Sequence, residues 1–297
     1  MKKNTGTCAV ALGTFDGLHL GHKALLDRLK TEAGDGLSVV YTFSNIPGNY
    51  FDLNLKQLFT SREKEVAISA EGIDVLYMRE FNKEVAETTR EQFIDELINK
   101  LSCSTIIVGY NYRFGRGGKG TAEYLAEETS KRGVRTVILP PVSVNGEPVS
   151  STAIRNRILS GDVESANVLL GRSYSVSGIV TEGSRIGRTL GFPTANIDPP
   201  EMKCIPDNGV YAVTVELGSD KYIGMTNIGH RPTINLSEKR VIETYIFDFS
   251  GDIYGKEIKL SFDKRIRPEV RMSDRNELIA QLNTDLLTIR DYYKDFA

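Results

Sequence analysis

The sequence is poor in cysteine, in long hydrophobic runs and in net charge, and each shortage excludes a class of protein. Its three cysteines, Cys8, Cys103 and Cys204, are far apart and form no Cys-x-x-Cys pair, so we predict free thiols in a reducing compartment. No apolar run reaches the ~18 residues of a membrane span, and the first residues do not resemble a signal peptide. A net charge of −2 gives no electrostatic indication of nucleic-acid binding. We therefore expect a cytoplasmic protein, monomeric or weakly homo-oligomeric, with neither nucleic-acid nor membrane partners.

A chain of 297 residues has room for about two domains, and its pattern changes near Gly171. In the first half, apolar segments at 7–13, 37–43, 74–78, 105–109 and 135–139 alternate with helical patterns at 20–30, 61–70, 90–101 and 121–133. This alternation predicts an α/β domain with a parallel sheet, which we place at 1–171 together with a connecting helical segment. Short alternating segments follow in 172–297, and they predict an antiparallel β-barrel with a C-terminal helix near 274–296.

The first loop of the α/β domain holds two of the three histidines in the sequence. Ligands of such sheets bind at the loops beyond the carboxyl ends of the strands. His19 and His22 face one side of a first helical turn, where free N–H groups and a histidine donor suit phosphate oxygens. The spacing also fits a structural capping turn or a metal-binding pair, although zinc is disfavoured because no cysteine or acidic partner lies at ligand spacing.

The order Gly13-Thr14-Phe15-Asp16-Gly17-Leu18-His19-Leu20-Gly21-His22 resembles the His-x-Gly-His element of nucleotidylyltransferases, and more narrowly that of prokaryotic FAD synthetases. The resemblance implies transfer of AMP from ATP to FMN, with release of pyrophosphate. It also implies that ATP is bound by Gly13, Phe15, His19 and His22, with His22 catalytic.

A second element of that family is similar to the segment Val149-Ser150-Ser151-Thr152-Ala153-Ile154-Arg155. The resemblance implies that Ser150, Ser151, Thr152 and Arg155 meet the triphosphate, and that Arg155 is catalytic. A plain helix N-cap explains the three hydroxyl residues equally well.

The segment from Tyr110 to Thr121 looks like the family's Gly-x-(Asp or Asn)-aromatic-x-Phe-Gly loop. With that likeness the flavin would be bound by Phe43, Asn111, Arg113 and Phe114. A P-loop is excluded because Lys119 precedes Gly120 rather than Ser or Thr, whereas a solvated surface loop stays open. The sequence departs from the family after the second strand, where Asn45 replaces the first proline of Phe-x-Pro-x-Pro. FMN adenylylation is therefore the activity that most needs testing.

The stretch from Gly183 to Asn196 combines glycines at 183, 187 and 191 with two arginines. Such a loop can fold over phosphates, although an ordinary glycine-rich hairpin fits the composition equally well. Pro193 favours an extended chain after it, so Thr194 and Asn196 should lie on one face of a strand. A hydroxyl and an amide oxygen so placed can complete the shell of a Mg²⁺ ion.

The run Arg188-Thr189-Leu190-Gly191-Phe192-Pro193-Thr194-Ala195-Asn196-Ile197 looks like the signature of riboflavin kinase. The resemblance implies ATP binding by Gly183, Gly187, Arg188 and Gly191, Mg²⁺ binding by Thr194 and Asn196, and flavin contacts by Arg267 and Arg271. Glu243 then matches the family's catalytic base. It lies in the segment 241–247, apolar on both faces, so we expect it to be buried; an edge-strand glutamate facing water is the alternative.

Together the two resemblances predict a bifunctional riboflavin kinase and FMN adenylyltransferase that uses riboflavin, FMN and ATP, with Mg²⁺ as cofactor. Two alternatives stay open. One is a single-activity enzyme, and the other is a flavin- or nucleotide-binding regulator that has lost turnover.

Overall fold

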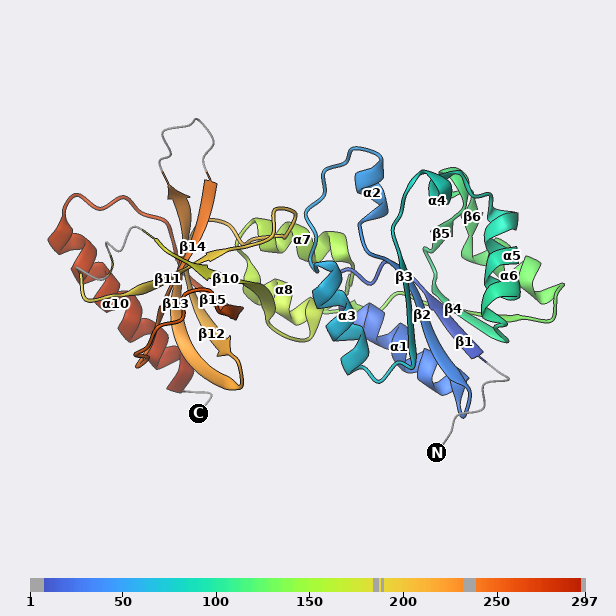
Figure 1. Ribbon diagram of the computed structural model, residues 1–297, viewed down its shortest axis with the longest axis horizontal. Helices are drawn as coiled ribbons and strands as arrows, with labels where there is room; N and C mark the ends of the chain where they lie inside the picture. The colour runs from blue at the N-terminus through green and yellow to red at the C-terminus, as the bar shows by residue number, and fades with distance from the viewer. Residues whose placement is uncertain (1–7, 184–186, 188–189, 232–238, 295–297) are drawn as a thin grey trace. The chain divides into compact units, whose positions relative to one another are not determined.

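The computed structural model describes residues 8–183, 187, 190–231 and 239–294 (Figure 1). The chain forms two compact units, Met1–Ser151 and Thr152–Ala297. Residues 152–171, which the sequence grouped with the first domain, fall in the second unit. Asn167 gives one reason, since its amide nitrogen donates to the Phe262 carbonyl at 2.8 Å and its amide oxygen accepts the Tyr174 N–H at 2.7 Å.

The first unit is built on a five-stranded sheet in the order β3-β2-β1-β4-β7, with every pair parallel. Its strands are β1 Cys8–Leu12, β2 Leu37–Phe43, β3 Val75–Arg79, β4 Thr105–Gly109 and β7 Arg135–Leu139. The predicted parallel α/β sheet is confirmed. Leu12 pairs with Tyr41, so the loop after β1 begins beside the end of β2.

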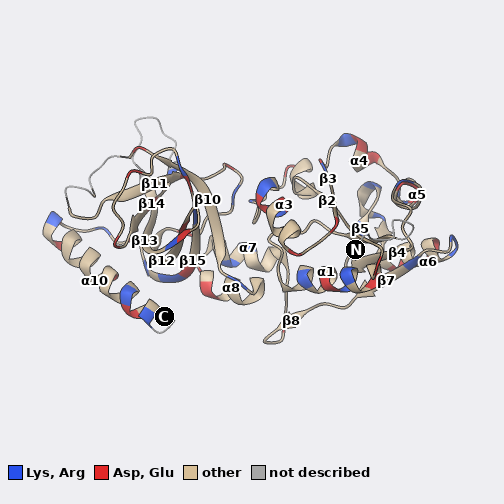
Figure 2. Ribbon diagram, turned by 60° about the horizontal axis from the view of Figure 1, so that its bottom comes forward, with Lys and Arg blue, Asp and Glu red and all other residues tan. Residues whose placement is uncertain are grey.

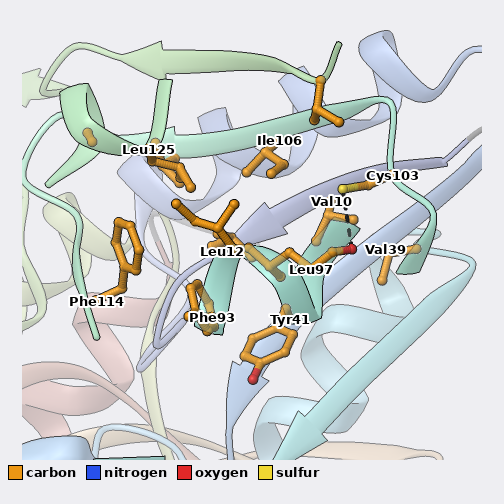
Figure 3. Close-up of a cluster of buried hydrophobic side chains, with 14 of the residues drawn as sticks. Val10, Leu12, Val39, Tyr41, Phe93, Leu97, Cys103, Ile106, Phe114 and Leu125 are labelled. Atoms are coloured by element: carbon orange, nitrogen blue, oxygen red, sulfur yellow. Dashed lines mark hydrogen bonds between the residues drawn. The ribbon is translucent and has the colours of Figure 1, made fainter. Parts of the chain in front are cut away.

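Helices cover both faces of this sheet (Figure 1). One face carries α1 Leu20–Ala33 and α3 Ser61–Ala70, and the other carries α5 Arg90–Leu101 and α6 Ala122–Ser130. Val10 and Leu12 lie in a buried cluster with Leu97 of α5 and Leu125 of α6 (Figure 3), whereas Ala9 and Ala11 face the cluster that contains Leu26 of α1. This alternation follows from the period of two along a strand.

Short elements complete the first unit. They are α2 Pro47–Tyr50, α4 Lys83–Glu87, the hairpin of β5 Arg113–Phe114 and β6 Gly120–Thr121, the 3₁₀ turn η1 Arg116–Gly118, and the hairpin of β8 Ser143–Val144 and β9 Glu147–Pro148. The helix α5 begins with a capping box, in which Thr89 and Gln92 each bond to the backbone of the other.

The second unit contains a closed antiparallel barrel in the order β10-β11-β14-β13-β12-β15, as predicted. Its strands are β10 Tyr174–Thr181, β11 Thr194–Asp198, β12 Gly209–Leu217, β13 Asp220–Arg231, β14 Lys239–Ile246 and β15 Glu257–Pro268. Helix α7 Ser151–Leu159 and helix α8 Val163–Leu170 precede the barrel, and α10 Arg275–Lys294 follows it and runs alongside it (Figure 1). Ile289 of α10 is fully buried in a cluster with Val210 and Met225.

The three cysteines are free, as the sequence predicted, and the structure places all three in buried positions. The Cys103 thiol donates to the Leu97 carbonyl at 3.6 Å (Figure 3). Over the described ranges, no helix combines the length and the apolarity that crossing a membrane requires.

Candidate active sites

The loop between β1 and α1 has an unusual backbone conformation. Phe15, Gly17 and Leu18 have φ values of 46°, 84° and 41°. Positive φ is costly for residues with a side chain, so the surroundings must hold Phe15 and Leu18 in place. At Gly17 a Cβ atom would lie 2.8 Å from a methyl carbon of Leu58, so this position also needs glycine for space.

The carboxylate of Asp16 holds this loop. Its two oxygens accept the backbone N–H groups of Leu58 at 3.2 Å and Phe59 at 2.9 Å, and the side chain is buried. The Ser151 hydroxyl donates to the Asp16 carbonyl at 2.8 Å. The loop is thereby tied to the segment before α3 and to the first residue of α7.

The two histidines of the loop stack on each other. His19 is the N-cap of α1, and its Nδ1 accepts the N–H of His22 at 3.2 Å. The ring centroids lie 3.6 Å apart, and the Phe15 ring lies 5.1 Å from that of His22. His22 is 9% exposed, and its Nδ1 has no hydrogen-bond partner among the described residues. A buried polar atom of this kind is one that a bound ligand can satisfy.

Both histidines are kept neutral by their surroundings. Burial lowers the pKa of His19 to about 4, although a hydrogen bond to its backbone opposes the shift. The pKa of His22 is lowered well below its usual range by burial, and then by the charges of His19 and Lys64. At neutral pH each ring therefore offers one N–H donor and no charge.

The segment before α7 comes close to this loop within the first unit. A Cβ at Gly21 would lie 3.9 Å from the Val149 carbonyl, and Ser151 bonds to Asp16. The structure thus brings Gly13, Phe15, His19, His22 and Ser151 into one region, and Ser150 directly precedes Ser151. Thr152 and Arg155 belong to the second unit, so their role beside the histidines stays a prediction.

An aromatic cluster, which sequence reasoning missed apart from Phe43, lies at the ends of β2 and β3. The Phe81 ring is 5.3 Å from Phe43, 5.7 Å from Tyr50 and 6.1 Å from Phe51, measured between centroids. Tyr50 is 40% and Phe51 57% exposed. Asn45, the departure from the family pattern, fixes this cluster: its amide donates to the Phe81 carbonyl at 3.0 Å and accepts the Phe81 N–H at 2.8 Å.

The other predicted flavin-binding residues of this unit differ in how far their side chains are exposed. Asn111 and Arg113 are exposed, after β4 and on β5. The Phe114 side chain is instead part of the core, 5.2 Å from Phe93 and 5.8 Å from Tyr112 between centroids (Figure 3). A ring packed in this way has little surface left for a ligand.

Lys64 on α3 is a buried charge that sequence reasoning also missed. It is 3% exposed, and its Nζ donates to the Phe43 carbonyl at 2.5 Å. Burial lowers its pKa to about 8, and the Asp16 carboxylate opposes this shift. The sequence did hold a signal, since Lys64 lies four residues before the fully buried Ile68 and therefore on the inner face of α3.

The second site lies on the barrel. Glu243 on β14 pairs with Asn196 on β11 and with Asn227 on β13. Paired residues of neighbouring strands point to the same face, and Thr194 lies two residues before Asn196. Three predicted residues, Thr194, Asn196 and Glu243, are thus brought together. Asn227 joins them, a residue that the sequence analysis did not single out.

The expectation that Glu243 is buried is wrong. Glu243 is half-buried, whereas Ile242, Thr244 and Ile246 are buried on the alternate face of β14. The Thr244 and Thr226 hydroxyl groups form a hydrogen bond of 2.8 Å. Because both faces of this strand are apolar in sequence, the pattern did not reveal which face lies inside the barrel.

Two described glycines of the glycine-rich stretch, Gly183 and Gly187, lie close to Asn196 and Thr194. A side chain at Gly183 would clash with the Asn196 amide, and a Cβ at Gly187 would lie 3.4 Å from the Thr194 hydroxyl. The Gly187 carbonyl accepts the N–H groups of Leu190 at 3.0 Å and Phe192 at 2.9 Å. Gly191 adopts a φ of 86°. Arg188 lies outside the described residues.

Arg267 has a structural partner. Its Nε lies 3.0 Å from both carboxylate oxygens of Asp285, and its Nη2 lies 2.9 Å from one of them. Asp285 is 1% exposed, so this pair joins β15 to α10. Arg271 is exposed in the segment before α10. The flavin contacts of both arginines stay predictions.

Two family models match the chain, FAD synthetase over residues 1–153 and riboflavin kinase over residues 170–293. The bifunctional riboflavin kinase/FMN adenylyltransferase of Bacillus subtilis is 36% identical over 292 residues, which cover 96% of this chain and 92% of that protein. The protein of the same name from Escherichia coli K12 is 35% identical and covers 96% and 93%.

A crystal structure from Streptococcus pneumoniae, described as a macrolide-efflux protein, shares the fold with a TM-score of 0.88 and 33% identity over 98% of this chain and 97% of its own. Neither family model that matches the present chain carries that description. The order of the two matched models agrees with the order of the two folds, an α/β unit before a barrel. The chain belongs to the family of bifunctional riboflavin kinase/FMN adenylyltransferases.

Proposed function

We propose that the barrel unit phosphorylates riboflavin to FMN and that the α/β unit adenylylates FMN to FAD, each with ATP. The observation that carries the kinase assignment is the pairing of Glu243 with Asn196, whose amide lies close to Gly183. The stacked, neutral histidines at the start of α1 carry the adenylyltransferase assignment.

In the kinase half, the Glu243 carboxylate takes the proton of the terminal ribityl hydroxyl. The oxygen then attacks the γ-phosphorus of ATP, and the bond to the β-phosphate oxygen breaks to release ADP. The two amide side chains that pair with this half-buried carboxylate can orient it for the transfer.

A Mg²⁺ ion fits the donors on β11. The Thr194 hydroxyl and the Asn196 amide are hard oxygen donors on one face, which leaves the remaining positions to phosphate oxygens and water. When bound, the ion would neutralise charge on the transferred phosphate. The glycine-rich loop above Thr194 and Asn196 would hold the phosphates through backbone N–H groups.

In the adenylyltransferase half, a phosphate oxygen of FMN attacks the α-phosphorus of ATP and pyrophosphate leaves. His19 and His22 donate to phosphate oxygens from fixed positions, because stacking and the N-cap bond hold both rings. Ser150 and Ser151 would add hydroxyl donors at the start of α7.

The aromatic cluster of Phe43, Tyr50, Phe51 and Phe81 provides the flavin surface in this half. The two hydrogen bonds between the Asn45 amide and the Phe81 backbone, which we call the Asn45 clasp, hold Phe81 where the family pattern has prolines. Tyr50 and Phe51 leave exposed ring surface for stacking. This arrangement supports FMN binding despite the departure at Asn45.

One assay separates the proposal from its alternatives. The purified protein is incubated with ATP, MgCl₂ and either riboflavin or FMN, and the flavins are separated by chromatography. We expect FMN and FAD from riboflavin, and FAD from FMN. Only one of the two steps would indicate a single-activity enzyme, and neither step would indicate a binding protein without turnover.

A further inference from the structure

Among the described residues of the first unit, the mechanism above leaves one buried cation, Lys64, without a task. Residues 62–65 of helix α3 are alternately basic and acidic, and the helix carries both charge colours in Figure 2. Of these four residues only Lys64 is buried. Among the described residues Lys64 forms no salt bridge, and its single hydrogen bond goes to the Phe43 carbonyl. A buried ammonium is costly without a paired charge, whereas an aliphatic side chain would pack on this face as Ile68 does.

The position of the ammonium is fixed by several contacts around the end of β2. The Ser61 hydroxyl donates to the Ser44 carbonyl at 3.0 Å, and Thr60 and Glu63 form a capping box at the start of α3. The Thr42 hydroxyl donates to the Thr14 carbonyl at 3.0 Å, which ties the end of β2 to the loop after β1. Lys64 Nζ, bonded to Phe43, is therefore held beside the loop that carries the histidines.

Two titratable groups interact electrostatically with this ammonium. Asp16 of the loop raises the pKa of Lys64, and Lys64 in turn lowers the pKa of His22. Asp16 already accepts two backbone N–H groups, so it compensates the charge of Lys64 only in part. The neutral histidines bring no positive charge to a site that must receive a triphosphate.

We propose that Lys64 is a positioning residue for adenylyl transfer. Its ammonium, held at the Phe43 carbonyl, supplies a fixed positive charge behind the histidine pair. This charge attracts the ATP phosphates and the departing pyrophosphate. This inference rests on the proposed FMN adenylylation. Preorganised charge in a buried site stabilises developing negative charge without reorganisation during the reaction.

The test uses Lys64→Met, Lys64→Arg and, as a matched control, Lys23→Met in the full chain. Lys23 directly follows His22 in sequence, but its side chain is 46% exposed and pairs with Glu71 at 3.4 Å. Initial rates of FMN adenylylation and of riboflavin phosphorylation are measured against ATP concentration. For Lys64→Met we expect kcat/KM for ATP in adenylylation to fall by roughly 10- to 100-fold, with phosphorylation unchanged. Lys64→Arg should restore most of the loss, and Lys23→Met should behave as wild type.

The pH profile separates a role of charge from a role in packing. Since the pKa of Lys64 lies at about 8, the wild-type adenylylation rate should fall above that pH as the ammonium loses its proton. Arginine stays charged, so Lys64→Arg should keep its rate there. An unchanged alkaline limb in Lys64→Arg would overturn the proposal, and so would an equal loss of both activities in Lys64→Met in a folded protein.

A second measurement does not depend on turnover. The ring protons of His22 are titrated by NMR in wild type and Lys64→Met, or in Lys64→Gln if the methionine variant does not fold. Removing the cation should shift the midpoint upward, and an unchanged midpoint would contradict the inference. If wild type makes no FAD from FMN, the proposed function fails by itself, and the titration still decides whether Lys64 acts on the histidine.

Discussion

Glu243 is the residue on which the kinase assignment depends most directly. Glu243→Gln keeps the size and the shape of the side chain but removes its ability to take a proton. We expect riboflavin phosphorylation to fall by roughly 10²- to 10⁴-fold, the usual contribution of a general base, with FMN adenylylation unchanged. Glu216→Gln serves as a control, because Glu216 lies on β12 in an ion pair with Lys259 at 3.0 Å. A variant as fast as wild type would remove Glu243 from the chemical step.

Neutral imidazoles at the start of α1 also predict how stability depends on pH. The pKa of His19 is about 4 in the folded protein, below its usual 6.5, so the unfolded chain takes up the proton first as pH falls. The free energy of unfolding should therefore decrease from about pH 6.5 down to about pH 4, by on the order of 3 kcal/mol for this group.

Urea unfolding at several pH values, in wild type and in His19→Asn, isolates this contribution from that of the carboxylates. Asparagine keeps an N-cap acceptor but does not titrate. As the pH is lowered, the free energy of unfolding of wild type should decrease relative to that of the variant. Parallel curves would mean that His19 is not held neutral.

At the scale of elements, the Asn45 clasp gives a prediction about flavin binding. Asn45→Ala removes both hydrogen bonds to the Phe81 backbone and frees the aromatic cluster. The KM for FMN should rise by roughly 3- to 10-fold, since the platform is no longer preorganised, whereas the KM for ATP should not change. Asn82→Ala is the matched control, because Asn82 follows Phe81 but caps α4 through the Val85 N–H at 3.2 Å. Equal KM values for FMN in both variants would argue against the clasp.

The helices and strands of the first unit could be predicted closely. Each strand is a short apolar run, and each helix has an apolar stripe along one face and a capping residue. The strands at 37–43 and 105–109 coincide with β2 and β4. Features that depend on contacts between distant segments could not be predicted. Asn45 and Phe81 are 36 residues apart in sequence, and the burial of Phe114 follows from its packing on Phe93. Barrel closure likewise decides which face of β14 Glu243 occupies.

At the scale of the whole molecule, each proposed site draws its central residues from one unit. Glu243, Asn196 and Asn227 come from β14, β11 and β13, whereas His19, His22 and Lys64 come from the loop after β1 and from α1 and α3. The two reactions should therefore be separable by substitution. His22→Ala should suppress FAD formation from FMN and leave FMN formation intact, the reverse of Glu243→Gln.

This separability is tested by mixing the two variants in one tube with riboflavin and ATP. Each protein alone should make FAD only slowly, because one lacks the base for the first step and the other a histidine for the second. The mixture should make FAD after a lag, because FMN released by His22→Ala diffuses to Glu243→Gln and accumulates until it approaches the KM of the second reaction. Chromatography of samples taken over time follows both flavins. If FMN accumulates without FAD, although Glu243→Gln converts added FMN, then FMN does not pass between molecules under these conditions and the two halves act only in sequence on one chain.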